Sequence, residues 1–222
     1  IYTPEFPSVT LSGTSQMSVS GGAFSGDNLS VTLSGVAKMD GLSGTWNKAN
    51  ITLSGSTHMD NLTLKSGTCY LTCSGVAEIA GVSSINSDKV QLSMSGATSI
   101  KIDNINSGLL EVNASELIAN LSGASAVKFT GKIGKISAEM QGASSLSLHG
   151  NGNEVTVSAF GTSTLNAKNF TVKDASLKLS GVAGATVTVT DNLETETSGS
   201  SHIDYYGNPK TVSNKSNNVV KH

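Results

Sequence analysis

Three chemically different side chains recur at one position of a repeated pattern in this sequence. Lys38, His58 and Glu78 follow one another at intervals of 20 residues, each three residues after a glycine that ends an SG pair. If strands stack at this interval, an ammonium, an imidazole and a carboxylate share one outward column, and such a row can act as an active site. The simpler interpretation, which the sequence favours, is a ladder of compatible surface charges worth roughly a few tenths of a kcal/mol.

Other candidate metal-binding and catalytic groups are sparse. Asp40 and Asp60 would stack one coil apart, close enough to share a calcium ion, although repetition alone explains them better. Cys69 and Cys73 would lie roughly 13 Å apart in an extended strand, beyond disulfide reach, and fit two buried free thiols. The sequence contains no His-x-x-x-His pair, Cys–His cluster or G-x-S-x-G nucleophile motif. It therefore predicts no catalytic residue, no metal site and no cofactor.

Aromatic side chains that could stack on a sugar ring are few, with five Phe, four Tyr and one Trp in the chain. Trp46, Tyr205 and Tyr206 are the aromatics expected to be exposed or half-exposed, and they are the candidate ligand-binding residues. For the two tyrosines a second interpretation is favoured, in which they cap the end of the fold.

Composition and charge exclude several classes of partner. The 14 basic residues, all Lys, and 16 acidic residues give a net charge of −2 without a run of like charge, so we expect no nucleic-acid or anionic-lipid binding. Val, Ile and Leu recur throughout a Gly- and Ser-rich chain, which is not the composition of a disordered linker. No apolar run reaches membrane-spanning length, and the opening IYTPEFPS, without a signal-peptide pattern, is expected to be the start of a mature or trimmed chain.

A repeat of about 20 residues must position all of these side chains. The segments VTLSGVAKM (31–39) and ITLSGSTHM (51–59) are two copies of a pattern that is anchored on a glycine. The anchor glycines are Gly13, Gly35, Gly55, Gly75, Gly96, Gly123, Gly142, Gly161, Gly181 and Gly199. Self-similarity at this period marks a solenoid, in which each unit buries its apolar side only by stacking on its neighbours.

Within each copy the apolar residues alternate with a period of two, which is typical of strands with one buried face. Leu33, Leu53 and Cys73, for example, each stand two residues before an anchor glycine. The glycine marks one bend, where no Cβ fits against the next coil, and the small residue two positions later indicates a tight inward corner. Asp, Asn or Gly eight residues before the anchor, as at Asn47, indicates a second bend with left-handed geometry.

Three short strands and three bends per coil predict an all-β fold, a single right-handed parallel β-helix of about ten coils that spans residues 1–222. Such a rod would be about 45–50 Å long. Outward Ser and Thr columns on its early coils could form a sugar-binding or ice-binding plane, but a solvated face whose hydroxyls bond one another is the favoured interpretation.

Two segments depart from the repeat. The 27-residue interval between Gly96 and Gly123 indicates an irregular coil or insertion near residues 101–119, either with VNAS (112–115) as a degenerate anchor or with a loop of about seven residues that bulges outward. Residues 203–222 are expected to form a C-terminal cap. Because open solenoid ends expose strand edges, a homo-oligomer formed through the ends or through a flat sheet is an alternative.

The closing segment SGSSHIDYYGNPKTV (198–212), with SGAS units such as that in NLSGASAVKF (120–129), resembles the GIN domain, the head domain of autotransporter adhesins that is frequent in Bacteroidetes. The family signature SGSS-I-YYGNP is matched by Ser198, Gly199, Ser200, Ser201, Ile203, Tyr205, Tyr206, Gly207, Asn208 and Pro209. His202 stands where the family commonly has Asp, and part of the family's N-terminal segment is expected to be missing. The resemblance implies a right-handed β-helix, export to the cell envelope, outer membrane or exterior, and an adhesive role without established catalytic residues.

These observations predict a non-enzymatic, surface-associated protein that acts as an adhesin or a structural spacer, with surface glycans or host matrix as partners. The alternative is a carbohydrate-binding or polysaccharide-degrading protein on the same scaffold. A concave groove with converging carboxylates and a stacking aromatic would favour that alternative, whereas a smooth rod would not.

Overall fold

The computed structural model describes residues 6, 8–101, 112–215 and 218–222, and these residues form 18 β-strands and no helix. The strands are β1 (Ser8–Leu11), β2 (Gln16–Ser18), β3 (Phe24–Leu33), β4 (Lys38–Asp40), β5 (Ser43–Gly55), β6 (His58–Asp60), β7 (Thr63–Gly75), β8 (Glu78–Ala80), β9 (Ser84–Met94), β10 (Ser99–Lys101), β11 (Val112–Leu121), β12 (Ala126–Met140), β13 (Ser145–Ala159), β14 (Thr164–Leu179), β15 (Gly184–Thr197), β16 (His202–Tyr206), β17 (Thr211–Asn214) and β18 (Val219–Lys221). The described part of the chain accordingly contains no helix that could cross a membrane.

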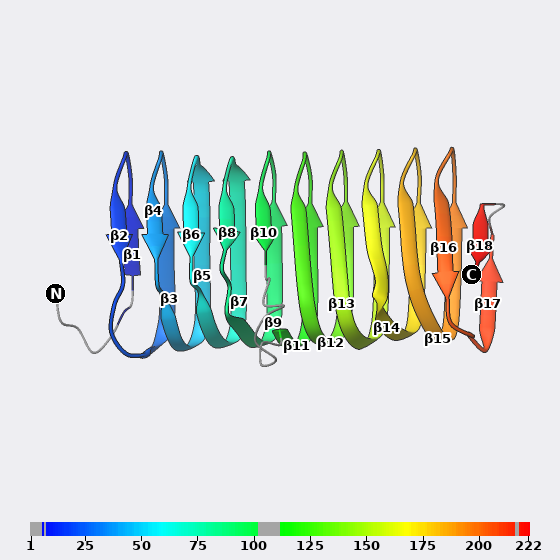
Figure 1. Cartoon of the computed structure of the whole chain (residues 1–222), viewed down its shortest axis with the longest axis horizontal. Helices are drawn as coiled ribbons and strands as arrows, with labels where there is room; N and C mark the ends of the chain where they lie inside the picture. Colours follow the sequence, from blue (N-terminus) through cyan, green and yellow to red (C-terminus); the bar gives the residue numbers. More distant parts are fainter. Residues whose placement is uncertain (1–5, 7, 102–111, 216–217) are drawn as a thin grey trace.

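All the strand pairings are parallel and join neighbouring coils, and the strands inside the rod pair with both the preceding and the following coil (Figure 1). One stack contains β3, β5, β7, β9 and β11, and a second contains the short strands β4, β6, β8 and β10. Strand β12 pairs with both β10 and β11, so it spans both stacks. Each of the strands β12, β13, β14 and β15 is likewise one continuous strand of 14 to 16 residues. The chain runs from one end of the rod to the other, which confirms the predicted parallel β-helix of about ten coils.

The predicted inward columns hold the coils in register. Leu33 pairs with Leu53, Leu53 with Cys73, and Cys73 with Met94, and their side chains are at most 2% exposed. Burial of each such apolar side chain contributes about 1.5–3 kcal/mol. Because the columns extend along most of the rod, apolar burial recurs from coil to coil rather than in one central core.

The anchor glycines form the tight bend that their spacing predicted. All ten have φ between 68° and 86°. A Cβ placed on Gly55 would lie 2.5 Å from the carbonyl oxygen of Gly35 in the preceding coil, so both the backbone conformation and the lack of space require glycine there. The small residues two positions later, such as Ala37 and Ser163, are buried, which confirms the inward corner.

The bend eight residues before the anchor is real, but its predicted left-handed geometry is wrong. The pairing of β5 with β7 runs from Trp46–Ser66 to Lys48–Thr68 and omits Asn47, as expected at a bend, yet the φ of Asn47 is not positive.

A further bend, which has left-handed geometry and which sequence reasoning missed, occurs six residues after the anchor. There Gly41, Asn61 and Gly81 have φ of 85°, 55° and 59°, and Asn61 is the one non-glycine residue with positive φ among the described residues.

Strand β11 shows how the 27-residue interval is accommodated. Asn113 pairs with Asn86 and Leu121 with Met94, so VNAS aligns with a bend and not with an anchor glycine, and the degenerate-anchor alternative is wrong. The extra residues of the interval therefore precede β11. The remainder of the predicted insertion, residues 102–111, lies outside the described residues.

The C-terminal segment continues the stack. In β17, Val212 pairs with Leu193, and in β18, Val219 pairs with Ile203. The last strands are thus laid over the buried columns of β15 and β16. That residues 203–222 act as a cap stays a prediction, which truncation can test.

Candidate functional site

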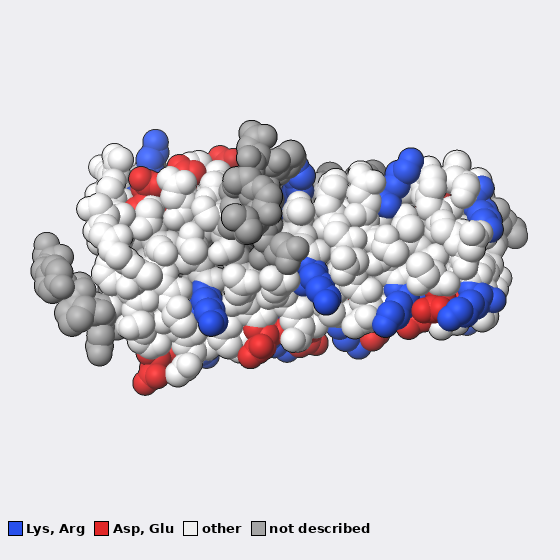
Figure 2. Space-filling model, turned by 60° about the horizontal axis from the view of Figure 1, so that its bottom comes forward, with Lys and Arg blue, Asp and Glu red and all other residues white. Residues whose placement is uncertain are grey.

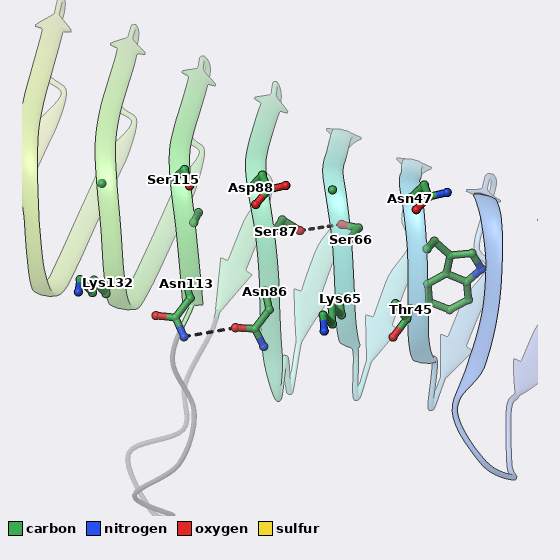
Figure 3. A pocket seen from close by; sticks show the side chains of 14 residues that line it. Thr45, Asn47, Lys65, Ser66, Asn86, Ser87, Asp88, Asn113, Ser115 and Lys132 are labelled. Carbon is green, nitrogen blue, oxygen red and sulfur yellow. Dashed lines mark hydrogen bonds between the residues drawn. The ribbon is translucent and has the colours of Figure 1, made fainter.

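A groove of about 610 Å³ runs along the bend shared by β5, β7, β9, β11 and β12 (Figure 3). We call it the axial groove, because its lining residues come from five successive coils and it follows the long axis of the rod. It is lined by Thr45, Trp46, Asn47, Lys65, Ser66, Gly67, Asn86, Ser87, Asp88, Asn113, Ala114, Ser115, Lys132 and Gly134. In each coil, two outward positions flank one inward position at the bend.

One bank of the groove is a row of polar side chains, one from each coil. Thr45, Lys65, Asn86, Asn113 and Lys132 pair in strict register along the parallel strands, and Figure 3 shows them side by side. Parallel strands set their spacing at about 4.8 Å. Asn113 Nδ2 donates to Asn86 Oδ1 over 3.3 Å, which links the two central members.

The opposite bank is formed by the bend itself. It carries Asn47, Asp88 and Ser115, which lie in a second row in Figure 3, with Gly67 between Asn47 and Asp88 and Gly134 after Ser115. A Cβ on Gly67 would lie 2.9 Å from the carbonyl oxygen of Asn47, so the packing of the coils excludes a side chain at this position. The glycine positions leave this bank interrupted and the groove open toward solvent.

The floor contains an unusual buried polar pair. Ser66 and Ser87 are 7% and 6% exposed, and their hydroxyl oxygens lie 2.6 Å apart in a hydrogen bond. Each hydroxyl is satisfied by the other, as buried polar groups require. The floor is therefore fixed in position beneath two rows of exposed hydrogen-bonding groups.

Trp46 closes one end of this floor, and the prediction that it is exposed is wrong. Its side chain is 2% exposed, and its indole Nε1 has no hydrogen-bond partner among the residues that the structure describes. Inward and outward side chains alternate along β5, and residue 46 occupies an inward position just before the bend. The missing side chain of Gly44 leaves room for the ring, because a Cβ there would overlap the far edge of the indole. A ring so enclosed offers no face for stacking on a sugar.

The charges of the axial groove differ from those of the neighbouring column. Lys65 and Lys132 are exposed, and among the described residues neither takes part in an ion pair. Three positions further along the strands, by contrast, Lys89 pairs with Glu116 at 2.9 Å and Lys135 with Glu154 at 3.1 Å. Figure 2 shows such neighbouring basic and acidic side chains along one edge of the rod.

The predicted row of Lys38, His58 and Glu78 exists, since these residues pair in register along β4, β6 and β8. His58 Nε2 lies 2.6 Å from Asp60 Oδ2, and its Nδ1 lies 3.4 Å from Glu78 Oε2. Both ring nitrogens thus face carboxylates of the protein. This arrangement fits the predicted ladder of surface charges.

Asp40 and Asp60 also stack in register, as predicted. Each carboxylate already faces a neighbour, because Asn61 Nδ2 donates to Asp40 Oδ1 over 2.7 Å and Asp60 contacts His58. Within the described ranges no group of three or more His, Cys, Asp or Glu side chains is arranged to hold a metal ion.

Tyr205 and Tyr206 lie far along the chain from Trp46, at the C-terminal end of the rod, so the structure does not bring the three candidate residues together. Tyr206 stacks on His222 with ring centroids 5.1 Å apart, and Lys168 Nζ lies 4.3 Å above the tyrosine ring. Tyr205 packs against the core. These contacts fit the capping interpretation of the two tyrosines.

The two cysteines are free and buried, as predicted. Burial raises the pKa of both Cys69 and Cys73 to about 12, because the thiolate loses hydration inside the coil. Their thiols therefore stay protonated at neutral pH and behave as small apolar groups.

A second groove, of about 510 Å³, lies on β13, β14, β15 and β17 and is acidic. Its lining includes Glu154, Asp174 and Glu194. Each of these carboxylates has a partner: Glu154 pairs with Lys135, Asp174 accepts from Asn192 Nδ2 over 2.6 Å, and Glu194 lies 3.8 Å from Lys215 Nζ. The groups form part of the ladders that connect neighbouring coils.

Comparison with protein families shows which family the chain resembles. A family model described as "Putative auto-transporter adhesin, head GIN domain" matches residues 87–209, which is more than half of the chain. The matched range includes the closing signature at 198–209, and it confirms the resemblance that the sequence predicted. Neither the curated proteins nor the solved structures include a match to this chain.

Proposed function

This chain belongs to the auto-transporter adhesin head GIN domain family, and from that membership we propose that it is a non-enzymatic adhesive head presented at the cell surface. Its ligands in this proposal are glycans or matrix components of another surface. Export to the cell envelope or exterior is part of the proposal, because an adhesive head must face its partner.

The observation that carries the proposal is the lining of the axial groove. Amides, hydroxyls and ammonium groups recur from coil to coil, whereas the lining contains one carboxylate, Asp88, within the described part of the chain. Hydrolysis of a glycosidic bond ordinarily uses two carboxyl groups on either side of the scissile bond. A surface with many hydrogen-bonding groups and a single carboxylate supports binding and retention of a ligand better than its turnover.

The rod supports presentation of that surface. Each coil stacks on the next through buried columns, and ladders such as Lys178–Glu196, with an N–O distance of 3.2 Å, connect neighbouring coils on the outside. A solenoid of this kind keeps its outward side chains at fixed spacing along its length. Ligand groups that repeat along a polymer can then be contacted simultaneously, which raises the apparent affinity.

Display of the chain on a non-adherent bacterium tests the proposal. We expect the displaying cells to attach to a subset of glycan and matrix arrays, while cells with an empty display vector do not attach. Labelling of intact native cells with a membrane-impermeant reagent should modify the chain, as surface exposure requires.

Two outcomes contradict the proposal. Absence of attachment without any turnover would favour a structural spacer. Absence of attachment combined with release of reducing sugars from a polysaccharide would favour an enzyme on the same scaffold.

A further inference from the structure

We propose that the axial groove binds a linear glycan that bears carboxylate groups and lies along the long axis of the rod. The inference names the ligand class of the site and rests on the proposed adhesive function. Its basis is the order of side chains along one bank, which runs Lys65, Asn86, Asn113 and Lys132 over consecutive coils.

The direction of the ligand follows from the register. The bank presents one side chain per coil at a spacing of about 4.8 Å, because adjacent parallel strands carry these residues. One sugar residue of an extended polysaccharide advances by a comparable distance. A linear chain along the axis would therefore meet an equivalent protein group at each residue, whereas a chain across the rod would meet only one coil.

The central amides suit sugar hydroxyls. Asn86 and Asn113 share one hydrogen bond, which uses one donor of Asn113 and one acceptor site of Asn86. An asparagine side chain has two donors and two acceptor lone pairs, so most of the capacity of this pair is left for a ligand. Sugar hydroxyls both donate and accept, and Ser115 on the opposite bank adds a group of the same kind.

The two lysines specify the charge of the ligand. Lys65 and Lys132 flank the amide pair on the same bank and are exposed. In the neighbouring column the ammonium of Lys89 is neutralised by Glu116, but neither groove lysine has such a partner within the described part of the chain. Among the described residues of the lining Asp88 is the single carboxylate, so these residues carry an excess of positive charge that favours an anionic polymer.

The buried serine pair fixes the spacing of the bank. Ser66 and Ser87 each follow a bank residue, Lys65 and Asn86, in the same strand, and their hydrogen bond connects the two coils directly beneath the groove. Because the backbone there is in a parallel ladder, the bank is arranged before any ligand arrives. Preorganisation of this kind reduces the entropy lost on binding.

Binding of defined oligosaccharides to the purified chain tests the inference. The probes are oligomers of galacturonic acid and of mannuronic acid, with galactose oligomers of equal length as the neutral comparison, measured by calorimetry at low and at moderate salt. The variants are Lys65→Gln, Lys132→Gln and their combination. Lys173→Gln is the matched control, since Lys173 is an exposed lysine on β14 that does not line the axial groove.

We expect the acidic oligomers to bind more tightly than the neutral ones and less tightly as salt rises. Each single variant should weaken binding about threefold and the double variant about tenfold, while the control binds as the parent does. Thermal unfolding of all variants should be unchanged, because exposed lysines without partners contribute little to stability.

Equal binding of acidic and neutral oligomers, equal binding by parent and double variant, or no binding of either acidic oligomer at millimolar concentration would each overturn the inference. Its failure is separable from failure of the proposed function. If displayed cells attach to an array and the double variant attaches equally well, the adhesive function stands and the groove is not its site. If acidic oligomers bind in solution but displayed cells attach to nothing, the groove assignment stands and the adhesive function does not.

Discussion

The hydroxyl oxygens of Ser66 and Ser87 lie 2.6 Å apart beneath the axial groove, in adjacent coils that are 21 residues apart in sequence. Both side chains are nearly buried, and they pair with each other where other coils place Trp46, Ala114 or Ile133. The pair therefore joins two coils by a polar contact within a column of inward side chains that is otherwise apolar.

This pair predicts a non-additive effect on stability. Ser66→Ala should lower the free energy of unfolding by about 1–2 kcal/mol, because the hydroxyl of Ser87 is left buried without a partner. Replacement of both serines by Ala should lower it by less than the sum of the two single changes. Urea denaturation of the three variants measures the coupling. Additive losses would show that the hydroxyls do not depend on each other.

Two anchor glycines allow the cost of left-handed backbone to be measured separately from the cost of steric overlap with the next coil. Gly13 and Gly55 both have positive φ, 68° and 86°. A Cβ at Gly55 would meet a neighbouring backbone atom, whereas no atom of the described residues lies within 4 Å of a Cβ at Gly13. Gly13→Ala should lower the free energy of unfolding by about 1–2 kcal/mol, the cost of left-handed backbone for an L-residue. Gly55→Ala should lower it clearly more, and chemical denaturation provides the comparison. Equal losses would contradict the overlap.

The single tryptophan predicts a spectroscopic result. Because Trp46 is 2% exposed, its fluorescence should have a short-wavelength maximum, resist quenching by acrylamide and remain unchanged when a glycan binds in the groove. Trp46→Ala should lower the free energy of unfolding by about 3–5 kcal/mol, since a large core side chain is removed. An emission maximum typical of water-exposed indole would contradict the buried position.

The buried thiols predict a dependence of stability on pH. Burial raises the pKa of Cys69 and Cys73 from about 9 to about 12, so the folded protein holds these protons more tightly than the unfolded chain. Their contribution to stability is complete below pH 9 and is lost as the pH rises toward 12. Urea midpoints measured across this range should fall further for the parent than for a Cys69→Ala, Cys73→Ala variant. Rapid alkylation of the native protein at neutral pH would contradict burial of the thiols.

The last strands predict the effect of a truncation. Removal of residues 207–222 takes away β17 and β18 and exposes the columns that end in Leu193 and Ile203. We expect the free energy of unfolding to fall by about 2–4 kcal/mol and the protein to associate, because an unpaired apolar edge is left open. Light scattering and denaturation measure both effects. His222→Ala removes the stacking on Tyr206 and the 3.0 Å contact of His222 Nε2 with Asp204 Oδ1, but it keeps both strands in the chain. It is the control and should cost less than about 1 kcal/mol, because both contacts are exposed. A truncated chain that stays monomeric and equally stable would show that the segment is no cap.

Much of the fold could be predicted because its determinants are local and repeat along the chain. The alternation that ends in Leu33, Leu53 and Cys73 requires one buried face per strand, and a 20-residue recurrence leaves stacking as the means of covering it. The bend at Asn61 was missed because Gly41, Asn61 and Gly81 recur over a short part of the chain and lie outside the anchored motif.

The residues of the candidate site could not be predicted from the repeat, because they depend on contacts and register between coils. Trp46 was expected at the surface as a potential sugar platform, but whether an aromatic ring fits inside depends on the space that Gly44 leaves, which no periodicity reveals. The sequence did not single out Lys65, Asn86, Asn113 and Lys132 as a row, because Asn113 lies inside the irregular interval between Gly96 and Gly123 and its register was ambiguous. The pairing of Asn113 with Asn86 resolves it.

The sequence by itself determined the length of a coil, the inward columns and the glycine bend, because side-chain alternation and glycine's freedom at positive φ act within a few residues. Only the tertiary structure decided which outward residues share a groove, which charges are neutralised and where the tryptophan lies. Those properties arise from how one coil bends and how the next is laid over it, and they depend on residues about 20 positions apart in sequence that meet only after the chain has wound.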